Sequence, residues 1–208
     1  FKIAENIGLS HIELLAERKH NKENPLWTKE GKTNLINCAK RHKINLYSAC
    51  LDYIISHPIS EEYPGFDDTI KYTKNFINSC SELGIEIIIL PFLEASELNS
   101  ASKTASKKFL EEIKPLVKKR NILVSIESIA DPKILIQTLS KVDDKIFGCV
   151  YDTGNRASIV NDQEEEINKL SKYINHVHLK DKSLDNKNVV IGSGIVDFKK
   201  IFKGLKKI

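Results

Sequence analysis

Residues 84–91 read Gly-Ile-Glu-Ile-Ile-Ile-Leu-Pro, a nearly continuous apolar run between two residues that interrupt regular structure. Gly84 follows an amphipathic segment, and glycine is common just after the last turn of a helix. The run from Ile85 to Leu90 is too short for an ordinary helix, and Glu86 is its one polar residue. It therefore predicts a strand buried on both faces, which is typical of parallel sheets covered by helices.

Strand-like and helix-like segments alternate through the rest of the chain. Strand patterns occupy residues 11–14, 44–51, 85–90, 122–127, 147–152 and 175–180. Helical patterns occupy residues 28–43, 66–83, 101–120, 132–142 and 163–174, and Asp197 begins a final helix. Six strands that are each followed by a helix imply one parallel sheet covered by helices. We expect residues 1–208 to form a single domain of this α/β class.

Two architectures fit this alternation, an open doubly wound sheet and a (β/α)8 barrel. No Gly-x-Gly-x-x-Gly or Walker sequence follows the early strands, so a nucleotide-binding version has no support. Hydrophobic residues make up 41% and charged residues 29% of the chain, and the net charge is +4. A charge this small, with acids mixed among the lysines, does not predict a nucleic-acid partner.

The apolar runs are too short to span a bilayer, so we expect no membrane segment. The four cysteines are widely spaced and form no Cys-x-x-Cys pair. This usage favours reduced, mostly buried thiols over a disulfide framework or a zinc finger. Together these features predict a cytoplasmic protein.

Charged residues end three consecutive predicted strands, at Glu127, Asp152 and His178. Function gathers at the carboxyl ends of parallel strands in both candidate architectures. Because strand residues alternate between faces, His176, His178 and Lys180 share one face of the last strand. The same alternation places Glu127 and Asp152 on that face, which we expect to be the inner one.

Two carboxylates and an imidazole at adjacent strand ends could hold a divalent metal ion, since buried charges without a partner are costly. Mn²⁺, Mg²⁺, Co²⁺ and Zn²⁺ all suit such a set. The alternative is structural: Asp152 begins a turn with residues 153–155, Glu127 pairs with a lysine, and His178 is a hydrogen-bonded core histidine. The residues by themselves leave both interpretations open.

Five short motifs follow one another in an order found in a known family. They are Gly8-Leu9-Ser10-His11-Ile12-Glu13-Leu14, Ser125-Ile126-Glu127, Asp152-Thr153-Gly154-Asn155, His176-Val177-His178-Leu179-Lys180-Asp181 and Gly192-Ser193-Gly194-Ile195-Val196-Asp197-Phe198. In this order the chain resembles the sugar-phosphate isomerase/epimerase family of xylose-isomerase-like TIM barrels. The resemblance covers essentially the whole chain and is strongest to L-ribulose-5-phosphate (L-xylulose-5-phosphate) 3-epimerases and hexulose-6-phosphate isomerases.

The resemblance implies a (β/α)8 TIM barrel whose first and eighth strands are missing from the printed sequence. The six predicted strands then correspond to the second through the seventh. A typical barrel has ~250 residues, and this chain has 208 and contains no Met. We expect the absent strands to belong to the protein although the sequence as printed lacks them.

By this resemblance Glu127 is a metal ligand that also acts as acid and base, and Asp152 and His178 are further ligands. A second glutamate, from the eighth strand, would complete the set. The divalent ion would hold the ketose carbonyl and the adjacent hydroxyl while one glutamate removes a proton and the other returns it. The implied partner is a small-molecule sugar phosphate, and the implied assembly is a homodimer.

Six further residues could contact the substrate, and each has a simpler alternative. They are Lys180, Glu13, His57, Gly192, Ser193 and Gly194. Lys180 could contact substrate oxygens or phosphate, or stay solvated, and Glu13 could line the cavity or pair with a lysine. The loop 192–194 could bind phosphate through its backbone N–H groups, or be an ordinary turn. His57 could reach the site from its loop, or be exposed.

Other functions remain open on the sequence. Another enzyme of the same superfamily, such as a hydroxypyruvate isomerase or an inosose dehydratase, would share the motifs. The AP endonucleases share the barrel but hold several metals with many histidines, and only two of the six histidines here fall on the late strands. A barrel that binds a sugar phosphate without turning it over is the alternative from another class, and the missing second glutamate favours it.

Overall fold

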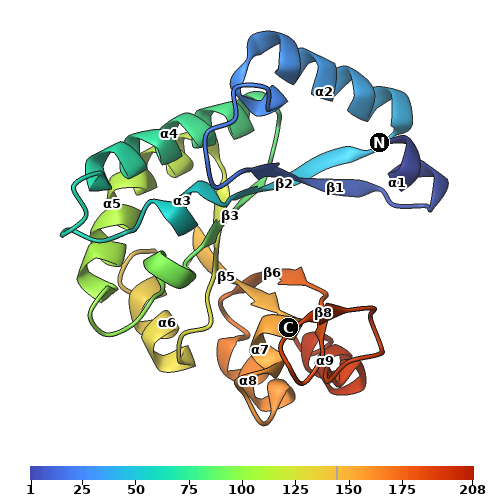
Figure 1. Ribbon diagram of the computed structural model, residues 1–208, viewed down its shortest axis with the longest axis vertical. Helices are drawn as coiled ribbons and strands as arrows, with labels where there is room; N and C mark the ends of the chain where they lie inside the picture. The colour runs from blue at the N-terminus through green and yellow to red at the C-terminus, as the bar shows by residue number, and fades with distance from the viewer. Residues whose placement is uncertain (144) are drawn as a thin grey trace.

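The computed structural model describes residues 1–143 and 145–208, and its centre is a parallel sheet of six strands. In sheet order these are β1 (His11–Ala16), β2 (Asn45–Leu51), β3 (Ile87–Pro91), β4 (Leu123–Glu127), β5 (Phe147–Asp152) and β6 (Ile174–His178). Strand order follows chain order, and each neighbouring pair is parallel. The sheet is curled, with helices on its outer side (Figure 1). The predicted barrel architecture is therefore confirmed as a curled, incomplete barrel.

The helices alternate with the strands as predicted. The α-helices are α1 (Lys2–Asn6), α2 (Lys29–His42), α3 (Tyr53–Ser56), α4 (Phe66–Glu82), α5 (Lys103–Arg120), α6 (Pro132–Leu139), α7 (Thr153–Ala157), α8 (Gln163–Leu170) and α9 (Phe198–Leu205). Two short 3₁₀ turns, η1 (Pro25–Trp27) and η2 (Glu94–Ser96), lie between them. After β6, the strands β7 (Asp181–Lys182) and β8 (Asn188–Val189) form a small antiparallel hairpin.

Local side chains explain where several helices begin and end. The carboxylate of Asp131 accepts a hydrogen bond from the Lys133 N–H at the start of α6. Asp197, predicted to begin the last helix, accepts one from the Lys200 N–H at the start of α9. These contacts satisfy backbone donors that a helix leaves free in its first turn. Gly84, after α4, has a φ of +73°, a conformation that costs glycine little.

Strand β3 has apolar partners on both faces, and all five of its residues are buried. Ile88 and Leu90 belong to the main core, which lies between the sheet and the outer helices. Ile87 and Ile89 point into the curl of the sheet, where they form a small apolar cluster with Cys50 and Val150. The buried strand expected in residues 84–91 is confirmed, although it begins at Ile87 rather than at Ile85.

Strand β6 differs more from its expected bounds. The helix predicted to reach residue 174 ends at Leu170, and β6 runs from Ile174 to His178. The register between β5 and β6 shifts by one residue at Asn175, so His176 pairs with Val150 and His178 with Asp152. The shift keeps both histidines on the face of Asp152, whereas Lys180 lies beyond the end of the strand.

The space for this bulge comes from a glycine. A Cβ atom added at Gly148 would lie 2.5 Å from the Asn175 side chain, which is too close. The position opposite Asn175 therefore requires a glycine. The Asn175 amide oxygen accepts a hydrogen bond of 2.7 Å from the Ser125 hydroxyl on β4. The Asn175 side chain of β6 thus crosses β5 at Gly148 and contacts β4, close to the carboxyl ends of the three strands.

The remaining structural expectations concern thiols and membrane segments. The four cysteines are free thiols, and three of them (Cys50, Cys80 and Cys149) are buried. This agrees with the spacing argument.

Within residues 1–143 and 145–208, no helix combines the length and the apolar character needed to cross a membrane.

Candidate metal centre

The three predicted ligands lie together at the carboxyl ends of β4, β5 and β6. The Nδ1 atom of His178 is 3.6 Å from Oε2 of Glu127 and 3.9 Å from Oδ2 of Asp152. One donor atom from each residue lies within 4.8 Å of the other two. Asp152 is 2% exposed and Glu127 is 7% exposed, so two like charges are buried side by side. Two such charges need a cation or a proton between them.

Asp152 has two separate roles, one for each carboxylate oxygen. Oδ1 accepts a hydrogen bond of 2.7 Å from the Asn155 N–H and so begins helix α7, as the structural alternative predicted. Oδ2 accepts no hydrogen bond, although it is buried. Its charge partner is the Nζ atom of Lys180, at 2.7 Å. The turn and the ligand interpretations are therefore compatible, because they use different oxygens.

Glu127 is held by a residue to which the sequence assigned no role. Its Oε1 accepts a hydrogen bond of 2.8 Å from the side-chain amide of Asn155. Burial raises the pKa of the Glu127 carboxyl above its usual range, and the negative charge of Asp152 adds to the effect. Asn155 thus contacts both carboxylates of the centre. The motif Asp152-Thr153-Gly154-Asn155 was the available signal, but it indicated only a turn and a resemblance.

His178 also faces a carboxylate on its other side. Its Nε2 atom is 3.4 Å from Oε1 of Glu13, which comes from the opposite edge strand, β1. Burial by itself lowers the pKa of His178, but contact with Glu13 and the charge of Glu127 raise it overall. The curl of the sheet is what brings β1 and β6 together here.

Glu13 has a complete set of polar partners. Its Oε2 accepts a hydrogen bond of 2.6 Å from the Ser48 hydroxyl and lies 3.4 Å from Nε2 of His176. Burial by itself would raise the pKa of Glu13, but its contacts with His176, His178 and Ser48 lower it well below its usual range. The sequence alternative for Glu13 was a lysine partner, and the structure provides two histidines and a serine instead.

The donor set fits a divalent cation. Asp152 Oδ2 is a buried oxygen without a hydrogen bond, and the Glu127 carboxylate and the His178 Nδ1 atom lie beside it. Two carboxylates and one imidazole suit Mn²⁺, Mg²⁺, Co²⁺ or Zn²⁺, and they leave other coordination positions for water or substrate.

The loop 192–194 has other partners for its backbone N–H groups. The amides of Gly192 and Gly194 donate to Oδ2 of Asp181, at 2.9 Å and 2.8 Å. The Ser193 amide donates to the Val190 carbonyl oxygen at 3.0 Å. Asp181 is 1% exposed, and its buried charge requires these donors. The three backbone N–H groups from which a phosphate site was expected are therefore engaged within the chain, two by the Asp181 carboxylate and one by a backbone carbonyl.

His57 lies against an aromatic side chain. Its ring stacks on Tyr53 with 3.6 Å between ring centroids, and its Nδ1 atom is 2.9 Å from the Tyr53 carbonyl oxygen. These contacts account for the half-buried ring, and they do not connect it to the three ligands.

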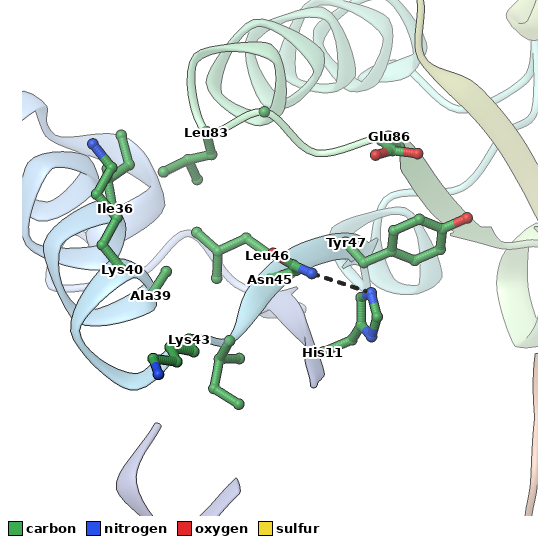
Figure 2. Close-up of a pocket in the computed structure, with 12 residues that line it drawn as sticks. His11, Ile36, Ala39, Lys40, Lys43, Asn45, Leu46, Tyr47, Leu83 and Glu86 are labelled. Atoms are coloured by element: carbon green, nitrogen blue, oxygen red, sulfur yellow. Dashed lines mark hydrogen bonds between the residues drawn. The ribbon is translucent and has the colours of Figure 1, made fainter. Parts of the chain in front are cut away.

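A cavity of about 570 Å³ lies at the other end of the sheet, where β1 and β2 begin. Figure 2 shows Asn45 beside His11 there, joined by a hydrogen bond of 3.4 Å. Its lining also includes Lys40, Lys43 and Glu86, but none of the three candidate ligands. We place the candidate site at the carboxyl ends because two buried carboxylates and an imidazole meet there, whereas none of these residues lines the cavity.

A curled parallel sheet with two carboxylates and an imidazole at its carboxyl ends defines an α/β barrel with a candidate metal centre. The chain belongs to the xylose isomerase-like TIM barrel family, which matches residues 1–208. Among curated relatives, L-ribulose-5-phosphate 3-epimerase UlaE from Escherichia coli is 24% identical, over 99% of this chain and 76% of its own length.

Two solved structures show the same fold. A D-tagatose 3-epimerase-like protein is 19% identical with a TM-score of 0.82, over 99% of this chain and 80% of its own. The IolI protein, with a bound zinc atom, is 17% identical with a TM-score of 0.78, over 100% of this chain and 78% of its own. The family expected from the motifs is therefore confirmed.

Proposed function

We propose that this chain is a metal-dependent epimerase or isomerase of a ketose phosphate. The observation that carries the proposal is the buried pair Glu127 and Asp152, joined by Nδ1 of His178. The curated relative, an L-ribulose-5-phosphate 3-epimerase, supports a pentulose phosphate as substrate. The IolI protein, whose structure holds a zinc atom, supports a bound metal in a barrel of this fold.

A divalent ion held by Glu127, Asp152 and His178 would act as a Lewis acid on the ketose carbonyl. Glu127 is the base that removes the proton from the carbon beside that carbonyl. Burial and the charge of Asp152 raise the pKa of this carboxyl, and a bound cation would act in the opposite direction. Asn155 fixes the orientation of this carboxylate through its hydrogen bond to Oε1.

Lys180 is the residue that we assign to the substrate's charged oxygens. Its ammonium group is 2.7 Å from Asp152 and its side chain is 33% exposed, so it borders the centre and also reaches solvent. Inversion of the carbon needs a second acid that returns the proton to the opposite face. The resemblance places that group on the eighth strand of a complete barrel, which is not one of the six strands of the parallel sheet and differs from the hairpin strand β8.

The test separates proton removal from full turnover. The protein is loaded with diamagnetic Zn²⁺ or Mg²⁺ and incubated with L-ribulose 5-phosphate in D2O, and NMR follows both deuterium uptake beside the carbonyl and formation of the epimer. Uptake requires only Glu127, whereas the epimer also requires the second acid. We expect Glu127→Gln to abolish both signals, because the neutral amide cannot accept the proton.

The matched control is Glu30→Gln, at an exposed glutamate of helix α2. It should leave deuterium uptake unchanged. Undiminished uptake in Glu127→Gln would overturn the assignment of the base. Binding of the sugar phosphate without any uptake in the unaltered protein would instead indicate a barrel that binds its ligand but does not react with it.

A further inference from the structure

The imidazole of His178 lies between the carboxylates of Glu127 and Asp152 on one side and that of Glu13 on the other. Its Nδ1 atom faces Glu127 and Asp152, at 3.6 Å and 3.9 Å. Its Nε2 atom faces Oε1 of Glu13, at 3.4 Å. Glu13 is on β1 and His178 is on β6, so this contact closes the curl of the sheet on its inner side.

A neutral imidazole has one lone pair and one N–H group, on different nitrogens. If Nδ1 of His178 is the atom that binds the cation, the hydrogen must be on Nε2, which faces Glu13. We propose that Glu13 is a positioning residue: it accepts the Nε2–H of His178 and keeps the Nδ1 lone pair directed at Glu127 and Asp152. This inference rests on the metal centre of the proposed function.

The contacts of Glu13 suit a fixed acceptor rather than a group that reacts. The Ser48 hydroxyl donates to its Oε2 at 2.6 Å, and Nε2 of His176 lies 3.4 Å from the same oxygen. Oε1 is left to face His178 alone. Glu13 and Ser48 are paired neighbours on β1 and β2, so two strands determine the position of the carboxylate. Metal-binding histidines commonly donate their second N–H to such a carboxylate.

The same residues allow a competing interpretation. Donor atoms of Glu13, His176 and His178 lie within 4.8 Å of one another and could themselves hold an ion. Ligands of a tetrahedral zinc with bonds of about 2.0 Å are roughly 3.3 Å apart, close to the 3.4 Å contacts of Glu13. A cation here would take the lone pair of His178 on Nε2 and leave an N–H directed at Glu127 and Asp152.

Two observations favour the positioning role. Asp152 Oδ2 is buried without a hydrogen bond, whereas Glu13 already accepts one from Ser48. The Glu13 side chain is also 30% exposed, against 10% for Glu127 and 2% for Asp152. The two buried carboxylates on the Nδ1 side have one ammonium group between them, that of Lys180 at 2.7 Å from Asp152, so negative charge without a partner is greater on that side of the ring.

The first test measures zinc affinity by isothermal titration calorimetry in the absence of substrate. We expect one Zn²⁺ per chain and a loss of affinity of about 10- to 100-fold in Glu13→Ala. Glu13→Gln should restore most of the affinity, because its amide oxygen can still accept the Nε2–H. Glu86→Ala, at a glutamate beside the other end of the sheet, is the matched control and should bind as the unaltered protein does.

The second test reads the tautomer directly. Nitrogen-15 NMR of the zinc-loaded protein should show the hydrogen of His178 on Nε2, and His176→Ala should lower the affinity less than Glu13→Ala. Three results would each overturn the proposal: a hydrogen on Nδ1, two zinc ions per chain, or unchanged affinity in Glu13→Ala. Thermal unfolding of each variant confirms that it is folded.

These readouts are independent of turnover. Loss of zinc affinity in Glu13→Ala without any epimerase activity in the unaltered protein would support Glu13 and overturn the proposed function. Epimerase turnover by the unaltered protein, together with unchanged zinc affinity in Glu13→Ala, would support the proposed function and overturn the role of Glu13. A protein that binds no divalent metal would overturn both.

Discussion

Glu127 and Glu13 lie on the two sides of one imidazole, and their carboxyl groups have pKa values shifted in opposite directions. Glu127 is buried beside Asp152, and both effects raise its pKa. Burial also acts on Glu13, but contacts with His176, His178 and Ser48 outweigh it and lower the pKa. The number of donors around each carboxylate, and not burial alone, decides the difference. Glu13 therefore stays an anion to lower pH than Glu127 does.

The largest expected effect is a loss of stability, caused by breaking a buried ion pair close to Glu127. Arg156 and Glu166 form a buried ion pair, and Arg156 Nη1 also donates to the Ala130 carbonyl oxygen, three residues after Glu127. Arg156→Met leaves Glu166 charged and buried, so we expect the free energy of unfolding to fall by about 3–5 kcal/mol. Urea unfolding measures this loss.

The control for this prediction is an ion pair at the surface. Arg18 and Glu94 make a two-contact pair, but their side chains are 49% and 59% exposed. Arg18→Met should change the stability by less than about 1 kcal/mol. If Arg156→Met lowered the free energy of unfolding no more than this control does, the buried pair would not stabilise the region around Glu127.

The next largest effect is expected from removing the charge of Asp152, which we propose as a cation ligand. Asparagine is also a good first residue for a helix, so Asp152→Asn should keep the start of α7 while losing the charge at Oδ2. We expect zinc affinity to fall by about 100-fold or more, a larger loss than for Glu13→Ala. Asp131→Asn, at the start of α6, is the matched control. Equal losses in Asp152→Asn and Glu13→Ala would remove the distinction between ligand and positioning residue.

A smaller effect, an increase in zinc affinity, is expected when Lys180 is replaced. The ammonium group of Lys180 is the present charge partner of Asp152, at 2.7 Å, and so competes with a metal ion for it. Because the lysine is partly exposed, we expect Lys180→Met to tighten zinc binding by only about three- to tenfold. Lys182→Met, whose lysine donates to Asn186 in the neighbouring hairpin, should have no such effect. Weaker zinc binding in Lys180→Met would contradict the competition.

The smallest effect concerns the donor that holds Glu13. Ser48→Ala removes one hydrogen bond of 2.6 Å, worth about 1 kcal/mol, from a carboxylate that keeps its two histidine neighbours. We expect zinc affinity to fall by no more than about threefold, as measured by calorimetry. Ser10→Ala, at an exposed serine before β1, should leave it unchanged. A loss as large as that in Glu13→Ala would mean that Ser48, not Glu13, controls His178.

Much of the fold was predictable because its signals are local. The apolar run in residues 84–91 predicts a strand with partners on both faces, and Ile87 to Pro91 are all buried. The alternation of faces correctly placed His176 and His178 on the side of Asp152. The bounds were less predictable, since β6 contains a bulge at Asn175 that depends on the space beside Gly148.

The candidate site was predictable only in part. Glu127, Asp152 and His178 could be selected because parallel strands bring their carboxyl ends to one edge. The partners of the loop 192–194 could not be predicted. The Gly192 and Gly194 amides donate to Asp181, and the chain must fold back over more than ten residues to bring these groups together. Contacts of this kind depend on the path of the chain and leave no periodic pattern in the sequence.

The sequence by itself determined the α/β class, through the alternation of strands and helices, and the three strand-end residues with their shared face, through the alternation of side chains along each strand. Only the tertiary structure decided that Glu13 of β1 meets His178 of β6, and that Asn155 contacts both Glu127 and Asp152. The reason is the curvature of the sheet. It brings together two edge strands that lie far apart in the chain. His178 therefore contacts Glu13 on one side of its ring and Glu127 and Asp152 on the other.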